Sequence, residues 1–313
     1  MGAEHRSAYL ETYRSGRLKD KIHAALAALK CCTLCPRRCR VDRLESDTRG
    51  VCNTGRRAWV SSFQRHFGEE APLVGQNGSG TIFFTFCSLK CNFCQNYDIS
   101  HEGLGQAVTD TQLAEMMLSL QQAGCHNINL VTPSHVVPQI LSALEKAIES
   151  GLTIPLVYNS SGYDRIKTLK LLEDVIDIYM PDFKFWEVRI AELTCQAPDY
   201  PEVARKAVRE MHRQVGDLVI GEDGIARRGL LIRHLVLPKG MAGTRNIMRF
   251  VYQKVSSNTY VNIMPQYRPC GRACEIPELS EPLSDKAFQH ALKAAREEGI
   301  ARLDSPRRAF LLW

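Results

Sequence analysis

The sequence predicts an α/β fold in which a partial, TIM-like (β/α)6 barrel carries a small N-terminal extension. Two observations support this fold class. From residue 81 onward, apolar β-rich runs alternate with segments of helical periodicity, the pattern of βα units around a parallel sheet. Before residue 75 the chain is instead rich in cysteine and arginine. We therefore expect a helix and a cysteine-rich metal-binding module in residues 1–75, and the barrel with a C-terminal helix in residues 76–313.

The barrel strands are predicted from short apolar runs rich in β-branched and aromatic residues. There are six of them: Thr81–Phe86, Asn127–Val131, Pro155–Tyr158, Val175–Met180, Leu230–Leu237 and Tyr260–Met264. Six βα units joined by right-handed crossovers are too few to close an eight-stranded barrel. The barrel should therefore be open, with a cleft on one side that admits a bulky substrate.

The helices are predicted from apolar residues at helical spacing. Between and after the strands these are Thr109–Gln122, Val136–Glu149, Asp164–Leu172, Pro201–Gln214, Thr244–Lys254 and Ser284–Glu298. Near the N-terminus, Arg17–Lys30 carries an apolar face that we expect to dock on its own chain. The apolar end Ala309–Trp313 should pack onto the barrel.

Composition limits the class of protein and its partners. With 44% hydrophobic and 24% charged residues the chain resembles an ordinary soluble protein, and no apolar run approaches the roughly 18 residues that span a bilayer. The first twenty residues are polar and do not resemble a signal peptide. We therefore expect a cytoplasmic protein without a membrane partner. The net charge of +6 is mild, and the arginine pairs lack interleaved aromatic residues, so we do not expect a nucleic-acid partner.

Three of the twelve cysteines follow the first predicted strand. Cys87, Cys91 and Cys94 can hold three irons of a 4Fe-4S cluster and leave the fourth iron open. An open coordination position marks a catalytic site, as it does at zinc. Three cysteines can also belong to a zinc knuckle, but the preceding strand and the aromatic Phe93 argue against that reading.

A second cysteine group supplies four thiolates and so closes its site. Its members are Cys32, Cys35, Cys39 and Cys52. Zinc and a second 4Fe-4S cluster use the same donors, so spacing cannot separate them, although we favour iron and sulfur. The group either passes electrons or stabilises a small module, and we favour the structural role. Cys125 and Cys195 are interpreted as inert thiols, and Cys270 and Cys274 lack a third partner.

Polar residues follow the predicted strands, where parallel strands direct them into one mouth. They lie in Thr132–His135, Asn159–Tyr163, Pro181–Lys184, Arg233–His234 and Pro265–Arg268. We expect these segments to hold the cofactor beside the cluster.

The cysteine spacing, with Phe93 directly before the last cysteine, resembles the radical S-adenosylmethionine (SAM) superfamily. The strand ends resemble the activating enzymes of glycyl radical enzymes, most closely the branch homologous to the pyruvate formate-lyase-activating enzyme. The resemblance implies that SAM chelates the open iron and that an electron from the cluster cleaves it. The resulting 5'-deoxyadenosyl radical abstracts a hydrogen atom, here from a protein glycine. Because cluster-bound SAM carries the chemistry, we assign no catalytic side chain.

The resemblance also implies partners and cofactor contacts. The partners are a protein or peptide substrate, which includes a glycyl radical enzyme, and an electron donor of the flavodoxin or ferredoxin type. The implied contacts are Phe93 against adenine, Asp182 and Lys184 as a DxK motif for SAM and a monovalent cation, Asn159, Ser160 and the Met180 carbonyl at that cation, Arg233 near the SAM carboxylate, and Gln266 or Tyr267 at the ribose.

Two departures from the activating enzymes leave alternatives open. Where those enzymes have Gly-Gly-Glu-Pro for the SAM amino group, this chain offers Thr132, Ser134 or His135. The N-terminal cysteines are absent from the plain pyruvate formate-lyase activator. A radical SAM enzyme that modifies a peptide, nucleic acid or small metabolite is therefore the alternative. A non-catalytic iron-sulfur or zinc protein that binds RNA is a remote one.

Overall fold

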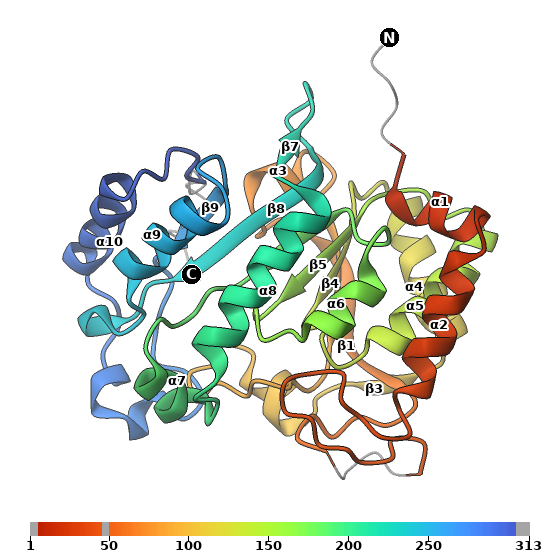
Figure 1. Ribbon diagram of the computed structural model, residues 1–313, viewed down its shortest axis with the longest axis horizontal. Coiled ribbons are helices and arrows are strands. Elements are labelled where there is room, and N and C mark those ends of the chain that lie inside the picture. The colour runs from red at the N-terminus through yellow and green to blue at the C-terminus, as the bar shows by residue number, and fades with distance from the viewer. Residues whose placement is uncertain (1–5, 46–49, 305–313) are drawn as a thin grey trace.

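The centre of the fold is a parallel sheet whose strands follow one another in space as they do in the chain. The computed structural model describes residues 6–45 and 50–304 (Figure 1). Its parallel strands are β2 (Ser79–Phe84), β4 (Ile128–Val131), β5 (Leu156–Ser160), β6 (Ile178–Pro181), β8 (Ala226–Leu235) and β9 (Tyr260–Met264). Each of the six predicted strands is present. The predicted α/β fold class, a partial barrel with a cysteine-rich N-terminal region, is confirmed.

Three further strands extend this sheet in the antiparallel sense, and sequence analysis missed them. β1 (Ala58–His66) pairs with β2, β3 (Gln106–Val108) pairs with β1, and β7 (Val219–Ile220) pairs with β8. The second half of β1 is exposed, so the sequence shows no sustained alternation of apolar and polar residues there. Since β1 precedes residue 75, the sheet contains strands from both expected parts of the chain, residues 1–75 and 76–313. The domain boundary at residue 75 stays a prediction.

Helices pack around the sheet and connect its strands. They are α1 (Ala8–Arg14), α2 (Arg17–Ala27), α3 (Ala71–Val74), α4 (Asp110–Gln122), α5 (Val137–Glu149), α6 (Ile166–Leu172), α7 (Val188–Cys195), α8 (Tyr200–Val215), α9 (Thr244–Lys254) and α10 (Asp285–Glu297). Short turns of other helix types are η1 (Asp98–Glu102), η2 (Pro238–Gly240), η3 (Ala273–Glu275) and η4 (Pro277–Leu279). The seven predicted helices are present, and α1, α3 and α7 are additional. The predicted apolar end 309–313 lies outside the described residues.

The N-terminal helices dock on the barrel as predicted for residues 17–30. α2 buries Leu18, Ile22 and Ala25 and packs against α5 and α6. Ser7 Oγ donates to the Thr153 carbonyl at 2.6 Å, and Thr12 Oγ1 donates to the Asp174 carbonyl at 2.6 Å. The segment before the first barrel strand is therefore attached to the middle of the chain.

The carboxyl ends of the parallel strands lie at one end of the molecule. The loop that follows α2 and carries the N-terminal cysteines reaches the same end (Figure 1). Both cysteine groups therefore lie where a barrel presents its loops for chemistry. Within the described ranges, no helix has the length and apolar character that a membrane span requires.

Candidate cluster and cofactor site

The first cysteine group lies on the loop after β2. Phe86 (φ 67°) and Lys90 (φ 54°) adopt the left-handed conformation, so this short loop turns sharply around its thiols. Leu89 N donates to Cys87 Sγ at 3.3 Å, and Ser100 Oγ donates to Cys94 Sγ at 3.2 Å. Burial, and then the neighbouring Cys91 thiol, raise the pKa of Cys87 to about 11. These thiols are therefore neutral until a metal displaces their protons.

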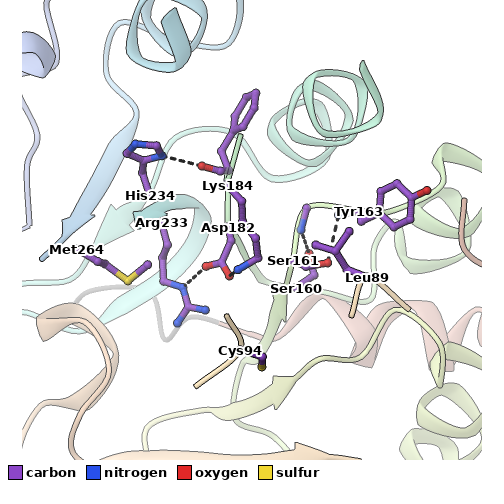
Figure 2. Close-up of polar contacts among 12 residues, drawn as sticks. Leu89, Cys94, Ser160, Ser161, Tyr163, Asp182, Lys184, Arg233, His234 and Met264 are labelled. Carbon is purple, nitrogen blue, oxygen red and sulfur yellow. Dashed lines mark hydrogen bonds and ion pairs between the residues drawn. The ribbon is translucent and has the colours of Figure 1, made fainter. Parts of the chain in front are cut away.

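An ion-pair cluster lies beside this loop at the ends of β5, β6 and β8. Asp182 accepts from Lys184 Nζ at 2.6 Å and from Arg233 Nε at 2.8 Å (Figure 2). Arg233 Nη2 also donates to Asn159 Oδ1 at 2.8 Å. The structure thus brings together four residues that the sequence nominated on three separate strands.

Electrostatics connect this cluster to the cysteines. Burial by itself would raise the pKa of Asp182, but Arg233 and Lys184 outweigh it and hold the pKa below its ordinary value. Burial would lower the pKa of Lys184, yet Asp182 and then Cys91 raise it overall. The pKa of Cys91 is raised chiefly by its hydrogen bond to Cys195, and that of Cys94 chiefly by burial; the Lys184 ammonium opposes both rises. A fixed cation therefore lies within electrostatic reach of two cluster thiols.

Ser160 and Met180 are the other nominated residues at the ends of β5 and β6, and their side chains do not hydrogen-bond to the Asp182 carboxylate. Ser160 Oγ donates to Asp164 Oδ2 at 2.6 Å and accepts from Gly162 N at 3.1 Å. Its hydroxyl is thus engaged with Asp164 rather than with Asp182. Met180 is buried in β6, in register with Asn159 of β5.

Aromatic side chains form a wall next to the cysteine loop. Phe93 is buried and meets Phe185 and Tyr267 with ring centroids 5.9 and 6.0 Å apart. The Tyr267 hydroxyl donates to the Leu279 carbonyl at 2.6 Å, whereas Gln266 is exposed and its carbonyl accepts from Gln95 Nε2 at 2.9 Å. Phe93 and Tyr267 therefore lie together, and Tyr267 already uses its hydroxyl within the fold.

The residues nominated after β4 do not join the Asp182 cluster. Thr132 has a φ of 62°, which turns the chain at the strand end. Ser134 is buried and hydrogen-bonds to Asp164 and Tyr158; burial raises the pKa of both groups, and the Ser134 hydroxyl partly opposes that rise. His135 Nε2 lies 3.0 Å from the Thr85 carbonyl. Ser134 and His135 therefore have partners in neighbouring parts of the fold rather than in the Asp182 cluster.

The four N-terminal cysteines converge on one enclosed pocket. Its lining includes Cys32, Cys35, Cys39 and Cys52, together with Arg43 and His135. Cys32, Cys35 and Cys52 are each 7% exposed, whereas the adjacent Cys31 is exposed and lies outside the pocket. Burial, and then the Cys52 thiol, raise the pKa of Cys35 to about 12.

A buried arginine and a buried histidine complete the lining of this pocket. Arg43 Nη1 lies 3.7 Å from Cys32 Sγ and donates to the His135 carbonyl at 2.8 Å. Burial and the Arg43 cation lower the pKa of His135 to about 3, so its imidazole is neutral. The pocket therefore combines four thiols, one fixed cation and one neutral imidazole.

Comparison with known proteins identifies the family. The model of the radical SAM superfamily matches residues 81–223. A protein of Methanocaldococcus jannaschii, named "Uncharacterized protein MJ0674", is 30% identical over 298 residues, which cover 93% of this chain and 82% of that relative. This chain belongs to the radical SAM superfamily. The relative's name carries no activity, so the comparison fixes the type of enzyme and leaves its substrate open.

Membership of the superfamily implies a 4Fe-4S cluster and SAM as cofactors, and the residues present fit both. Cys87, Cys91 and Cys94 supply three thiols from one loop, as a cluster with one open iron requires. Beside them lie an ammonium, a guanidinium and a carboxylate, which suit the charged amino acid part of SAM. The donor chemistry is therefore that of a radical SAM site.

In the ranges 6–45 and 50–304, no three His, Cys, Asp or Glu side chains lie where they could together hold one metal ion.

Sequence analysis missed three residues at this site. Arg37 donates to the carbonyls of Ser88, Leu89, Cys195 and Gln196 at 2.5–3.0 Å and so joins the N-terminal loop to the cluster loop. The Cys195 thiol, interpreted from the sequence as inert, hydrogen-bonds to Cys91 and is the main cause that raises the Cys91 pKa. Glu69 Oε2 lies 3.5 Å from Arg233 Nη1. None belongs to a motif, and only tertiary packing brings them to the site.

Proposed function

We propose that this radical SAM enzyme abstracts a hydrogen atom from a glycine of a protein partner, as the activating enzymes that it resembles do. The observation that carries the proposal is the ion-pair cluster of Asn159, Asp182, Lys184 and Arg233. It corresponds to the DxK motif and the carboxylate-binding arginine of those enzymes, and it lies next to Cys91.

The side chains have distinct tasks in this proposal. When bound, the cluster and SAM supply a 5'-deoxyadenosyl radical. Cys87, Cys91 and Cys94 would hold three irons, and Arg233 would bind the SAM carboxylate. Asp182 and Asn159 keep the Arg233 guanidinium in place through two hydrogen bonds, so little rearrangement is needed on binding.

Exclusion of water is the task of the aromatic wall. Phe93 contacts Phe185 and Tyr267, and all three are buried. An adenine packed on Phe93 would be shielded on that side, which protects a reactive radical from side reactions. A monovalent cation near Asp182 remains part of the proposal.

The first test is SAM cleavage by the anaerobic, dithionite-reduced protein. We expect 5'-deoxyadenosine from the wild type and none from Cys91→Ala, because the cluster loses one of its three ligands. Cys31→Ala is the matched control, since Cys31 is exposed, and it should retain the product. Absence of 5'-deoxyadenosine from the reconstituted wild type would overturn the proposal.

The second test addresses the glycine. The reduced enzyme is mixed with SAM and a candidate glycyl radical enzyme, with a reduced flavodoxin or ferredoxin as electron donor. We expect an electron paramagnetic resonance doublet, and α-deuterated glycine in the partner should place deuterium in 5'-deoxyadenosine. A signal that never appears with any such partner would argue against the glycine assignment.

A second candidate function is the modification of a peptide, nucleic acid or small metabolite. It is favoured by the loop after β4, where Ser134 and His135 have other partners and so do not replace Gly-Gly-Glu-Pro. In this case 5'-deoxyadenosine forms with the correct substrate without deuterium from glycine. A covalent change in the substrate's mass would then identify the product.

We also propose a second metal centre, an iron-sulfur cluster, in the N-terminal pocket. Four cysteines line it, and the buried Arg43 beside Cys32 would balance negative charge. Iron, sulfide and zinc are measured on anaerobically purified wild type and on Cys32→Ala/Cys35→Ala. We expect about eight irons per chain falling to about four. About four irons plus one zinc, with only zinc lost, would contradict an iron-sulfur centre.

A further inference from the structure

Among the described residues, His135 at the N-terminal pocket has a ring nitrogen without a hydrogen-bond partner. His135 is 1% exposed and lines the pocket with the four cysteines. Its Nδ1 is buried and makes no hydrogen bond within the part of the chain that the structure describes. An unpaired buried polar atom is costly, and one at a cluster of metal-binding side chains indicates a missing ligand.

The other ring nitrogen fixes what Nδ1 can do. His135 Nε2 lies 3.0 Å from the Thr85 carbonyl oxygen, which can only accept. Nε2 therefore carries the proton, and the neutral ring presents a lone pair at Nδ1. Histidines that bind metals in proteins almost always donate their other ring N–H to a carbonyl or carboxylate in this way.

No described group around the pocket hydrogen-bonds to this lone pair. Arg43 directs its Nη1 to the His135 carbonyl and to Cys32 Sγ, and its Nε is itself unpaired. Arg43 Nε and His135 Nδ1 therefore do not bond to each other. Four cysteine thiols line the same pocket, and thiolates bind soft metals. A metal bound there could also accept the lone pair of His135 Nδ1.

We propose that His135 Nδ1 is a ligand of the metal centre in the N-terminal pocket. Five donors exceed the four that a four-iron cluster takes from a protein. Cys39 is the half-buried donor, and exposed Arg38 and Arg40 flank it, whereas Cys32, Cys35 and Cys52 are buried. The four iron positions are therefore occupied by Cys32, Cys35, Cys52 and His135.

This assignment makes the centre a joint product of two parts of the chain. The cysteines come from residues 32–52, and His135 comes from the loop between β4 and α5. A loop of the barrel thus completes the site of the N-terminal module. The inference rests on the second metal centre proposed above, and its test separates the two.

The experiment isolates this centre in a variant that lacks the other cluster. Cys87→Ala/Cys91→Ala/Cys94→Ala is reconstituted anaerobically with iron and sulfide, reduced, and studied by pulsed electron paramagnetic resonance with 15N-labelled histidine. We expect about four irons per chain and a strong hyperfine coupling to one histidine nitrogen. No retained iron would overturn the second centre itself. Retained iron without nitrogen coupling would overturn only the His135 assignment.

Two further variants in the same background locate the ligand. His135→Gln keeps an N–H for the Thr85 carbonyl but removes Nδ1, so the nitrogen coupling should disappear and iron should be lost faster to a chelator. Cys39→Ser should keep both iron and coupling. Loss of iron from Cys39→Ser, together with retention in His135→Gln, would overturn the assignment. Circular dichroism and thermal melting check that each variant folds. If His135→Gln does not fold, the nitrogen coupling in the 15N-labelled triple cysteine variant, which keeps His135, still tests the inference.

Discussion

At the scale of single residues, Asp182 has the strongest electrostatic role among the described side chains at the site. It accepts from Lys184 and Arg233, and all three side chains are less than one fifth exposed. Removing one partner from a buried ion pair leaves uncompensated charge, which is strongly destabilising. Here the loss would leave two cations facing each other next to the cluster loop.

Asp182→Asn should therefore lower the free energy of unfolding by about 2–4 kcal/mol. Urea unfolding of the anaerobic protein, followed by circular dichroism, measures the change. The control is Arg213→Gln on the surface, where Arg213 pairs with Glu210 and Glu173 and its side chain is 52% exposed. The control should be close to the wild type. Equal stabilities of the two variants would contradict the role of Asp182.

Glu69 predicts a pH dependence of stability. Burial, and then Glu70, raise the pKa of Glu69 from 4.5 to about 7, against the effect of Arg233. A carboxyl group with a higher pKa in the folded chain holds its proton more tightly there. Its contribution to stability is therefore lost as pH rises from about 4.5 through about 7.

Glu69→Gln removes this titration. From pH 5 to pH 8, the free energy of unfolding of the wild type should fall by about 2 kcal/mol more than that of the variant. Urea unfolding at both pH values measures the difference. Glu202→Gln is the control, because Glu202 is exposed and its pKa is lowered, so it does not titrate in this range. A parallel pH dependence of Glu69→Gln and wild type would contradict the prediction.

The proximity of some nominated residues could be predicted from strand order alone. Asn159, Asp182 and Arg233 end neighbouring parallel strands, so pairing of the strands brings them together. His135, one of three candidates for the SAM amino group, lines the N-terminal pocket with the four cysteines. The pocket that a loop residue lines depends on the path of the backbone after the strand, which the residue types of that loop do not predict.

At the scale of elements, the connection between β5 and α6 approaches the end of β6 very closely. Gly162 has a φ of 72°, and a Cβ there would overlap the Asp182 carbonyl oxygen. Only glycine permits both the backbone conformation and the contact. The position of Asp182 thus depends on the absence of a side chain on a neighbouring loop.

Gly162→Ala should displace the end of β6 and weaken SAM binding at least tenfold, and it should destabilise the fold by more than about 2 kcal/mol. Isothermal titration with SAM and urea unfolding measure the two effects. Gly151→Ala is the matched control, because Gly151 also has positive φ, at 96°, but has open space around it. It should cost only about 1 kcal/mol and leave SAM binding unchanged. Similar effects at both glycines would contradict the contact.

Buried strands and long helices were the elements that could be predicted from the sequence. Each strand from β2 to β9 in the parallel sheet is a compact apolar run, because helices cover these strands. β1 was missed because its outer part, Phe63–Arg65, is exposed at an edge of the sheet. α7 was missed because its 8 residues are too few to show a clear helical period.

At the scale of the whole molecule, Arg37 connects the N-terminal loop to the radical SAM loop. Its guanidinium satisfies four backbone carbonyls, two on the cluster loop and two at the end of α7. Arg37→Met should loosen the cluster loop, and iron should be released to a chelator several-fold faster from the Cys87, Cys91 and Cys94 cluster. The release is measured in the Cys32→Ala/Cys35→Ala background, so that the second centre does not contribute.

Arg38→Met provides the comparison for this prediction. Arg38 is adjacent in sequence but exposed, so its variant should release iron at the rate of the background protein. Equal rates for the two arginine variants would show that the carbonyl contacts do not support the cluster loop. The comparison also controls for the loss of one positive charge.

The docking of the N-terminal segment has a consequence for the order in which the protein is made. Ser7 donates a hydrogen bond to the Thr153 carbonyl, and Arg37 donates one to the Cys195 carbonyl. His135 lines the pocket of the N-terminal cysteines. These first residues leave the ribosome before the groups that they contact have been synthesised, whereas the parallel strands pair with their immediate predecessors. The pocket of the N-terminal thiols therefore cannot be completed before His135 has been synthesised. During translation they are accessible to metal delivery and to oxidants, and the finished barrel then encloses them.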